Sequence, residues 1–242
     1  PEFTRIVASA GWSYKWGVQQ QRSQHRIDLL DINYLYMPSI DSLFREKYLE
    51  KDENYILKYN YEDRFIVRTG YSYIYNSAGR ALMNNSGIGN SYTIRLNFEL
   101  AGNLLYAVAK LGGMKKNALG EYTLLNIPFA QYLKGDFDFA KNLVIDNRNS
   151  LAFHFGAGIA IPYGNATMLP FEKRYFSGGA NSVRGWSVRD LGPGSFPGDN
   201  NFMNQSGDIK LDASIEYRSK LFWKFQGAVF IDAGNIWTIR SY

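Results

Sequence analysis

The sequence predicts an all-β protein, a transmembrane antiparallel β-barrel, because its segments alternate between apolar and polar side chains. The clearest segment is 208–218, which is apolar on one side and mostly charged on the other, and no helical segment is available to cover such a sheet. About eight segments of this kind occur, each near the ~9–11 residues that a strand needs to cross a bilayer. Lipid outside and water inside would satisfy both faces. In segment 208–218 the apolar set is Ile209, Leu211, Ala213, Ile215 and Tyr217, and the polar set is Asp208, Lys210, Asp212, Ser214, Glu216 and Arg218.

Composition sets limits on the alternatives. The chain of 242 residues has no cysteine, which excludes disulfides and thiolate metal sites. Its net charge of +5 is dispersed without a Lys/Arg run, so no nucleic-acid partner is expected. No stretch approaches the ~18 continuous apolar residues of a spanning helix. The 18 tyrosines gather near strand ends, where an amphipathic ring suits a membrane interface.

The first two strands are expected at 2–17 and 25–37, the second with weaker alternation at its start. The opening P-E-F-T-R-I has neither a charged nor an apolar leader region, so no signal peptide is expected, and the chain reads as a mature form or an excised piece. Residues 38–64 form a long loop, in which helical spacing over 40–52 predicts a short amphipathic helix. Its mixed charge favours packing on the barrel rim over a membrane-surface role.

Strands are then expected at 65–76 and 92–100, followed by a long loop whose residues 104–111 form one or two helical turns. The segment 129–141 is the next strand. Its charged side chains would cost several kcal/mol in hydrocarbon, so they must face a wet interior. Those charged residues are Lys134, Asp136 and Asp138.

The last three strands are expected at 151–163, 208–218 and 225–234. In the final one, Val229, Ile231 and Ala233 point outward, while Ala228, Phe230 and Asp232 point inward. Two glycines of strand 151–163, at 156 and 158, indicate a bend or close packing; no helix follows them, so a phosphate loop is excluded.

Between these strands lies a long segment, Phe171 to Phe196, with no periodicity of its own. Loops of this length are usually functional or disordered. This one carries four large aromatics with charged residues between them, so it has side chains that can pack and pair, and we expect it to be ordered. The aromatics are Tyr175, Phe176, Trp186 and Phe196, and the charged residues are Arg174, Arg184, Arg189 and Asp190.

The run R-Y-F-S-G-G-A-N-S-V-R-G-W, followed by D-L-G-P, resembles the signature loop of the BamA/TamA-type outer-membrane assembly and translocation family. The resemblance rests on Gly178 and Gly179, on the tetrad Val183, Arg184, Gly185 and Trp186, and on the downstream L-G-P in order. It implies a barrel of a sixteen-stranded type with a long loop, about residues 164–207, folded into the lumen. A barrel of only eight strands would have an interior filled by its own side chains, so the loop could not enter it.

The resemblance implies that residues 1–242 are a partial barrel in the bacterial outer membrane, with six strands before the loop and two after it. The family's periplasmic repeat domains and last three strands are expected to be absent from this chain. The implied role is not enzymatic and uses no cofactor. It is the insertion of nascent outer-membrane proteins or the translocation of substrates, with membrane lipids and possible accessory lipoproteins as partners.

In that family the arginine of the V-R-G-aromatic tetrad reaches an acid on the barrel wall. The corresponding arginine is Arg184, and the matching acids would be Glu216 in A-S-I-E-Y and Asp232 in F-I-D-A-G. Alternation independently places both acids on inward faces. The arginine would either act in transport or only staple the loop, and the residues alone leave both open. Asn181, Ser182, Gly185 and Gly179 are expected to set the tight backbone of the loop tip.

Two other functions remain as alternatives. A passive, porin-like channel would use charged lumen residues to select solutes. A barrel hydrolase would need a Ser/His pair, and His154 has Ser150 four residues before it on the same face, a spacing that is common by chance. His25 and His154 lie far apart, each without a second ligand nearby in the sequence, so no metal site is expected.

Overall fold

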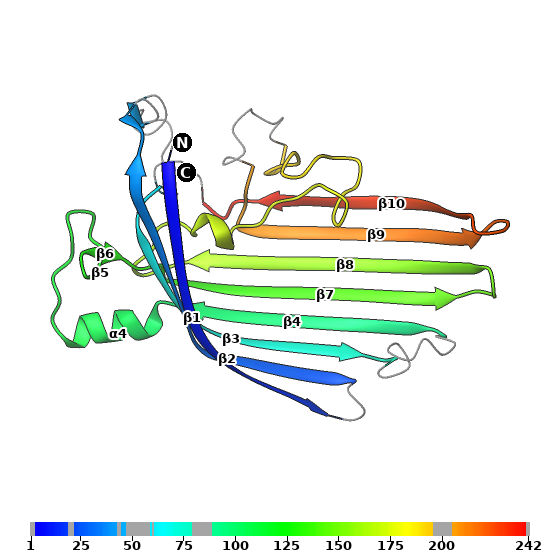
Figure 1. Cartoon of the computed structure of the whole chain (residues 1–242), viewed down its shortest axis with the longest axis horizontal. Coiled ribbons are helices and arrows are strands. Elements are labelled where there is room, and N and C mark those ends of the chain that lie inside the picture. The colour runs from blue at the N-terminus through cyan, green and yellow to red at the C-terminus, as the bar shows by residue number, and fades with distance from the viewer. Residues whose placement is uncertain are drawn as a thin grey trace.

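The computed structural model describes residues 3–18, 22–42, 45–46, 59, 61–78, 89–195 and 205–240. These form one antiparallel sheet of eight strands in the order β1-β2-β3-β4-β7-β8-β9-β10, with β1 and β10 at its edges (Figure 1). The all-β prediction and the eight strands are therefore confirmed. The strands are β1 (Phe3–Val18), β2 (Ser23–Ile40), β3 (Arg64–Asn76), β4 (Ser91–Ala101), β7 (Tyr132–Val144), β8 (Asn149–Pro162), β9 (Ile209–Lys220) and β10 (Gln226–Trp237).

Because consecutive strands are neighbours, their connections alternate between the two ends of the sheet. At the short-turn end, residues 145–148 join β7 to β8 and residues 221–225 join β9 to β10. At the opposite, long-loop end, residues 102–131 join β4 to β7 and residues 163–208 join β8 to β9. The helix α4 (Asn103–Leu111) and the small hairpin of β5 (Thr123–Leu124) and β6 (Ile127–Pro128) project from the long-loop end (Figure 1).

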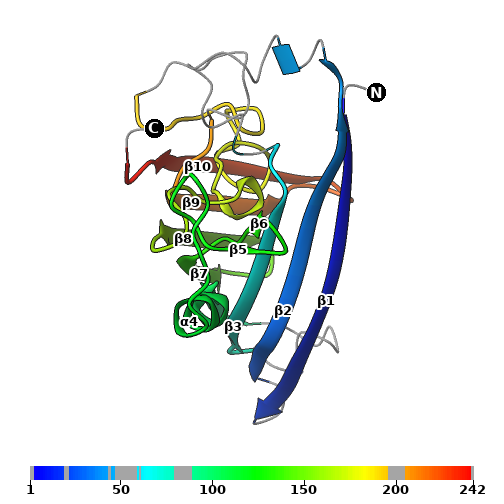
Figure 2. The same cartoon turned by 90° about the vertical axis from the view of Figure 1, so that its left-hand side faces the viewer.

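The sheet curves into a trough, and the loop after β8 lies on its concave side (Figure 2). On the convex side, Leu211, Ile215, Val229 and Ile231 leave 42–74% of their surface exposed. The opposite side of the same strands carries Asp212, which is 6% exposed. This sidedness is the one that the alternation of β9 predicts.

The buried core lies where the loop meets the long-loop end of the sheet. It joins strand residues from β2, β3, β4, β7, β8 and β10 to two residues of the loop, Leu169 and Tyr175. A short 3₁₀ turn, η3 (Phe171–Lys173), separates these two loop residues. The loop thus supplies part of the core, which fixes where its functional residues lie.

Several predicted boundaries are wrong. The strand expected from Phe129 begins at Tyr132, because Phe129 pairs in parallel with Phe65 and is only 1% exposed. The second strand continues through Pro38 to Ile40; its pairing with β3 stops at Leu35, so the proline breaks no ladder bond on that side. The last strand extends to Trp237.

The helical turns expected at 104–111 are confirmed as α4. Of the helix expected over 40–52 only residues 40–42, 45 and 46 are described, and Phe196 of the long segment lies outside the described residues.

Candidate functional site

The loop between β8 and β9 is closed at its neck by backbone pairing. Tyr175 and Gly207 exchange two hydrogen bonds, each 2.9 Å from nitrogen to oxygen. Further along, Ser177 pairs with Leu191 in an antiparallel bridge. Residues 175–191 therefore double back on themselves and present residues 179–186 as a tip.

The tip is built from tight turns. Gly178 and Gly179 have φ values of 97° and 91°, and a Cβ on Gly178 would lie 2.1 Å from the carbonyl oxygen of Ser187. This conformation excludes other residues. The amide of Gly179 donates to the carbonyl of Trp186 at 2.9 Å, which closes the tip around Val183 and Arg184. Gly185 has no left-handed φ and open space beside its Cα, so sterics do not require a glycine there.

The three residues predicted to pair the loop with the wall, Arg184, Glu216 and Asp232, lie together in the structure. The Nε of Arg184 donates to Asp232 Oδ2 and its Nη2 to Asp232 Oδ1, both at 2.7 Å, in a two-pronged pair. Its backbone amide also donates to Asp232 Oδ2 at 3.0 Å, and its Nη1 pairs with Glu216. A guanidinium held by two parallel hydrogen bonds is fixed in direction as well as in charge.

The wall completes this site with a ring and a second cation. The guanidinium carbon of Arg184 lies 3.5 Å above the ring of Phe230, which precedes Asp232 by two residues on β10. Arg218 donates to the other oxygen of Glu216 at 2.5 Å. The hydrogen bonds to Asp232, and after them those to Glu216, raise the pKa of Arg184, so the group stays cationic.

The two hydrophobic members of the tetrad differ in environment. Val183 is 7% exposed and lies against Gly234 of β10, whose added Cβ would be 3.0 Å from a Val183 methyl. Trp186 is 49% exposed. The valine therefore packs on the wall, while the tryptophan stands partly free.

A second set of loop contacts, not expected from the sequence, holds the neck. The hydroxyl of Tyr175 donates to Asp136 of β7 at 2.5 Å, and burial raises the pKa of this tyrosine. Lys134 places its ammonium 4.1 Å from the ring centre. The ring fits because residue 158 is a glycine, where a Cβ would come within 2.6 Å of it. The close packing expected at Gly158 is confirmed, and its partner is the loop.

The neck also joins a chain of charges across the concave face. Lys173 of the loop lies 2.7 Å from Glu99 of β4, which accepts from Arg68 of β3 at 2.8 Å. Arg68 in turn pairs with Asp31 of β2. Three consecutive ion pairs therefore tie the loop to three strands.

The most deeply buried charges lie at the two ends of the neck. Arg174 and Asp208 have side chains only 1% and 0% exposed, with Nε and Oδ1 3.8 Å apart. Asp208 also accepts the backbone amide of Ile239 at 3.0 Å. This pair joins the entry of the loop to the start of β9.

His154 lies among acids that the sequence did not place beside it. Its Nε2 is 2.6 Å from Asp138, and its Nδ1 is 3.9 Å from Asp212, so carboxylates and not Ser150 flank both ring nitrogens. Among the described residues, no group of three or more His, Cys, Asp or Glu could hold a metal ion. In the same residues no helix is both long enough and apolar enough to cross a membrane.

No sequence pattern indicates the neck contacts directly. Tyr175, Asp136 and Gly158 are separated by up to 39 residues, and no motif connects them. The available clue was the pair of glycines in β8, which stand where the loop and Asp212 approach the strand.

One known protein family matches almost the whole length of this chain. The Omp85 superfamily domain matches residues 2–242. The chain belongs to the Omp85 superfamily. Homologues in this superfamily are proteins of the outer membrane, and this chain is assigned to that membrane. Members of the superfamily act in outer-membrane protein assembly or translocation.

Two relatives of this Omp85 chain can be named. The outer membrane protein assembly factor BamA of Neisseria meningitidis serogroup B (strain ATCC BAA-335 / MC58) is 31% identical over 94 residues, which is 35% of this chain and 11% of that protein. The crystal structure of BamA from Haemophilus ducreyi lacking POTRA domains 1-3 aligns at 15% identity and a TM-score of 0.37, over 98% of this chain and 58% of that one. The Omp85 chain thus spans only part of either relative.

Proposed function

We propose that this chain is part of an Omp85 barrel that inserts nascent proteins into the outer membrane or translocates substrates across it. In this proposal the eight strands are half of a sixteen-stranded wall, and the concave face of the sheet is the lumen. The loop 164–207 is then a lumen-inserted element, and Arg184 is its fixed point. The activity is non-enzymatic and needs no cofactor.

The observation that carries the proposal is the pairing of Arg184 with two wall acids on neighbouring strands. Asp232 is on β10 and Glu216 on β9, so one guanidinium joins the loop to a hairpin of the wall. The side chains of the two acids are only 4% and 14% exposed. A loop pinned in this way can hold the lumen in one state and release it when the pair breaks, which suits a barrel that handles polypeptides.

The test is Arg184→Ala in the full-length protein, reconstituted in lipid vesicles with an unfolded outer-membrane substrate. We expect the initial rate at which folded substrate forms to fall at least tenfold, about 1.4 kcal/mol or more in activation free energy. Arg189→Ala is the matched control, because Arg189 is in the same loop but lies 4.3 Å over the ring of Phe171. The control should keep a near-normal rate.

The result also separates a role in transport from a role as a staple. If Arg184→Lys restores the folded barrel but not substrate assembly, the two-pronged geometry acts in transport. If neither Arg184 variant affects assembly or translocation, the proposal is wrong. A large, steady single-channel conductance with the loop intact would instead favour the passive channel.

A further inference from the structure

The turn between β9 and β10 has an unusual composition. Residues 221–225 read L-F-W-K-F, whereas hairpin turns normally use Gly, Asn or Asp. Its apolar side chains are also the most exposed run of large hydrophobics in the described part of the chain. The exposed fractions are 54% for Leu221, 71% for Phe222, 85% for Trp223 and 55% for Phe225.

The backbone of this turn holds the tryptophan at its tip. Leu221 donates its amide to the carbonyl of Phe225 at 3.0 Å, and Phe225 donates to Phe222 at 2.9 Å. Trp223 and Lys224 are therefore the two central residues. Trp223 has a φ of 51°, in the left-handed region that favours glycine. A strained conformation of this kind persists where the surrounding structure or a function requires the residue.

The turn continues the apolar convex face of the sheet. In the alternation of β9 and β10, Leu221 and Phe225 fall on the same side as Tyr217, Val229 and Ile231. The Leu221 side chain lies 3.4 Å from where a Cβ of Gly227 would be. The ring of Phe225 packs beside the other two rings of the turn: its centroid is 5.2 Å from that of Phe222 and 6.1 Å from that of Trp223. One apolar surface thus runs from the strands to the tip.

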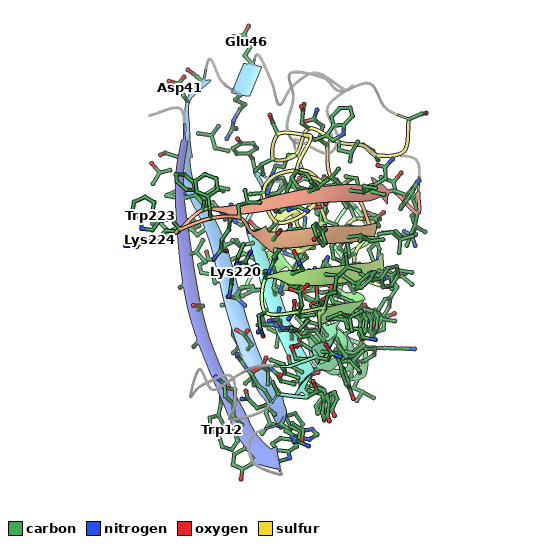
Figure 3. All side chains as sticks on the ribbon, turned by 90° about the vertical axis from the view of Figure 1, so that its right-hand side faces the viewer. Trp12, Asp41, Glu46, Lys220, Trp223 and Lys224 are labelled. Carbon is green, nitrogen blue, oxygen red and sulfur yellow. The ribbon has the colours of Figure 1, made fainter. Side chains whose placement is uncertain are left out.

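The basic residues around the turn divide between its two sides. Trp223 and Lys224 stand together at the tip of the hairpin, while Lys220 lies apart from them over the trough (Figure 3). The ammonium of Lys224 is 5.7 Å from the centre of the Trp223 ring. Only Lys224 is placed to accompany the rings outside the barrel.

We propose that residues 221–225 are an interfacial anchor that binds the phospholipid surface at the short-turn end of the barrel. The aromatic rings enter the boundary between headgroups and acyl chains, where tryptophan is favoured. Lys224 extends its charge to a lipid phosphate while its methylenes follow the apolar surface. The lipid is the occupant because the cluster is continuous with the lipid-facing wall, and short turns of outer-membrane barrels face the phospholipid leaflet on the periplasmic side.

The first test uses the lack of cysteine in this chain. A nitroxide is attached to single-cysteine variants of the full-length protein, in which any cysteine elsewhere is replaced: Trp223→Cys, Ile231→Cys and Asn147→Cys. Each labelled variant is reconstituted in phosphatidylglycerol/phosphatidylethanolamine vesicles. Ile231 is the lipid reference, and Asn147 is the reference in the neighbouring short turn. We expect the ratio of oxygen to nickel-chelate accessibility at 223 to be severalfold above that at 147 and below that at 231, as at the boundary between headgroups and acyl chains. A ratio like that at 147, or exclusion of both reagents by a covering protein, would overturn the anchor.

The second test separates anchoring from turn strain. Leu125 is the matched control, since it is also a tip residue, 81% exposed, with a φ of 52°, but at the long-loop end. Glycine relieves strain at both positions, so Leu125→Gly should keep or raise the urea midpoint in vesicles. Trp223→Gly should lower it, because lipid contacts are lost. A midpoint raised equally in both variants would refute the proposal, and neither measurement depends on assembly activity.

Discussion

The loop is held to the wall at two places, and they differ in burial. At its neck, Arg174 and Asp208 have side chains no more than 1% exposed, and Tyr175 fits over a glycine of β8. At its tip, Arg184 keeps 25% of its side chain exposed while pairing with Asp232 and Glu216. The neck joins elements of the core, whereas the tip contacts a single hairpin.

The difference in burial indicates which of the two attachments can open. A deeply buried pair loses much when one partner is removed, because the remaining charge cannot be solvated. A hydrated pair is weaker and sensitive to salt. The neck therefore fixes the loop in the fold, and the tip is the attachment that can open without unfolding the sheet.

The largest expected effect is at the neck. Asp208→Asn should lower the free energy of unfolding by about 3–5 kcal/mol, since the buried guanidinium of Arg174 would lose the negative charge that lies beside it. Urea unfolding of the full-length protein in vesicles measures this loss. Asp190→Asn, at an exposed carboxylate of the same loop, is the control and should stay within about 0.5 kcal/mol. Equal effects of the two variants would show that the neck is not held by charge.

Packing at the neck gives the next effect. Gly158→Ala should cost about 1–3 kcal/mol, because the new Cβ meets the ring of Tyr175, which Asp136 holds in place. Gly135→Ala on β7 is the matched control, since a Cβ there meets nothing within 4 Å. Thermal unfolding of both variants would decide the point, and a neutral Gly158→Ala would mean that the loop moves aside freely.

The tip should contribute less to stability than the neck. Arg184→Ala should cost about 1–3 kcal/mol, below the value for a fully buried pair. Asp232 and Glu216 are only 4% and 14% exposed, but removal of the quarter-exposed arginine side chain opens both carboxylates to water. Its cost should also shrink from low to molar salt, whereas that of Asp208→Asn should not. Parallel urea titrations at the two salt concentrations measure both. A salt-independent loss at Arg184 would place the tip in the same class as the neck.

Most of the sheet follows from the sequence, because alternation is local information. The parity of β9 and β10 put Glu216 and Asp232 on one face, and the structure has both carboxylates on Arg184. The start of β7 was missed because Phe129 fits the apolar pattern, although its backbone pairs with Phe65. Strand ends depend on such tertiary partners, which a local pattern does not contain.

The neck of the loop could not be predicted for the same reason. Tyr175 meets Asp136 only because the neck closes at Gly207 and residue 158 lacks a side chain. Each of these conditions lies in a different part of the chain. The contacts of the tip could be predicted because the tetrad motif indicates Arg184, and the strand parity independently places Glu216 and Asp232 on the inward face.

The smallest expected effect concerns Trp186, the aromatic of the V-R-G-W tetrad. It is 49% exposed, and it contributes to the turn through its backbone: its carbonyl accepts from Gly179 and its amide donates to Val183, groups that alanine also supplies. Trp186→Ala should therefore change the unfolding free energy by no more than about 0.5 kcal/mol. Urea unfolding beside Arg184→Ala makes the comparison. A loss above that of Arg184→Ala would mean that the ring is buried in the full-length protein, and the tip would then be held by packing as well as by charge.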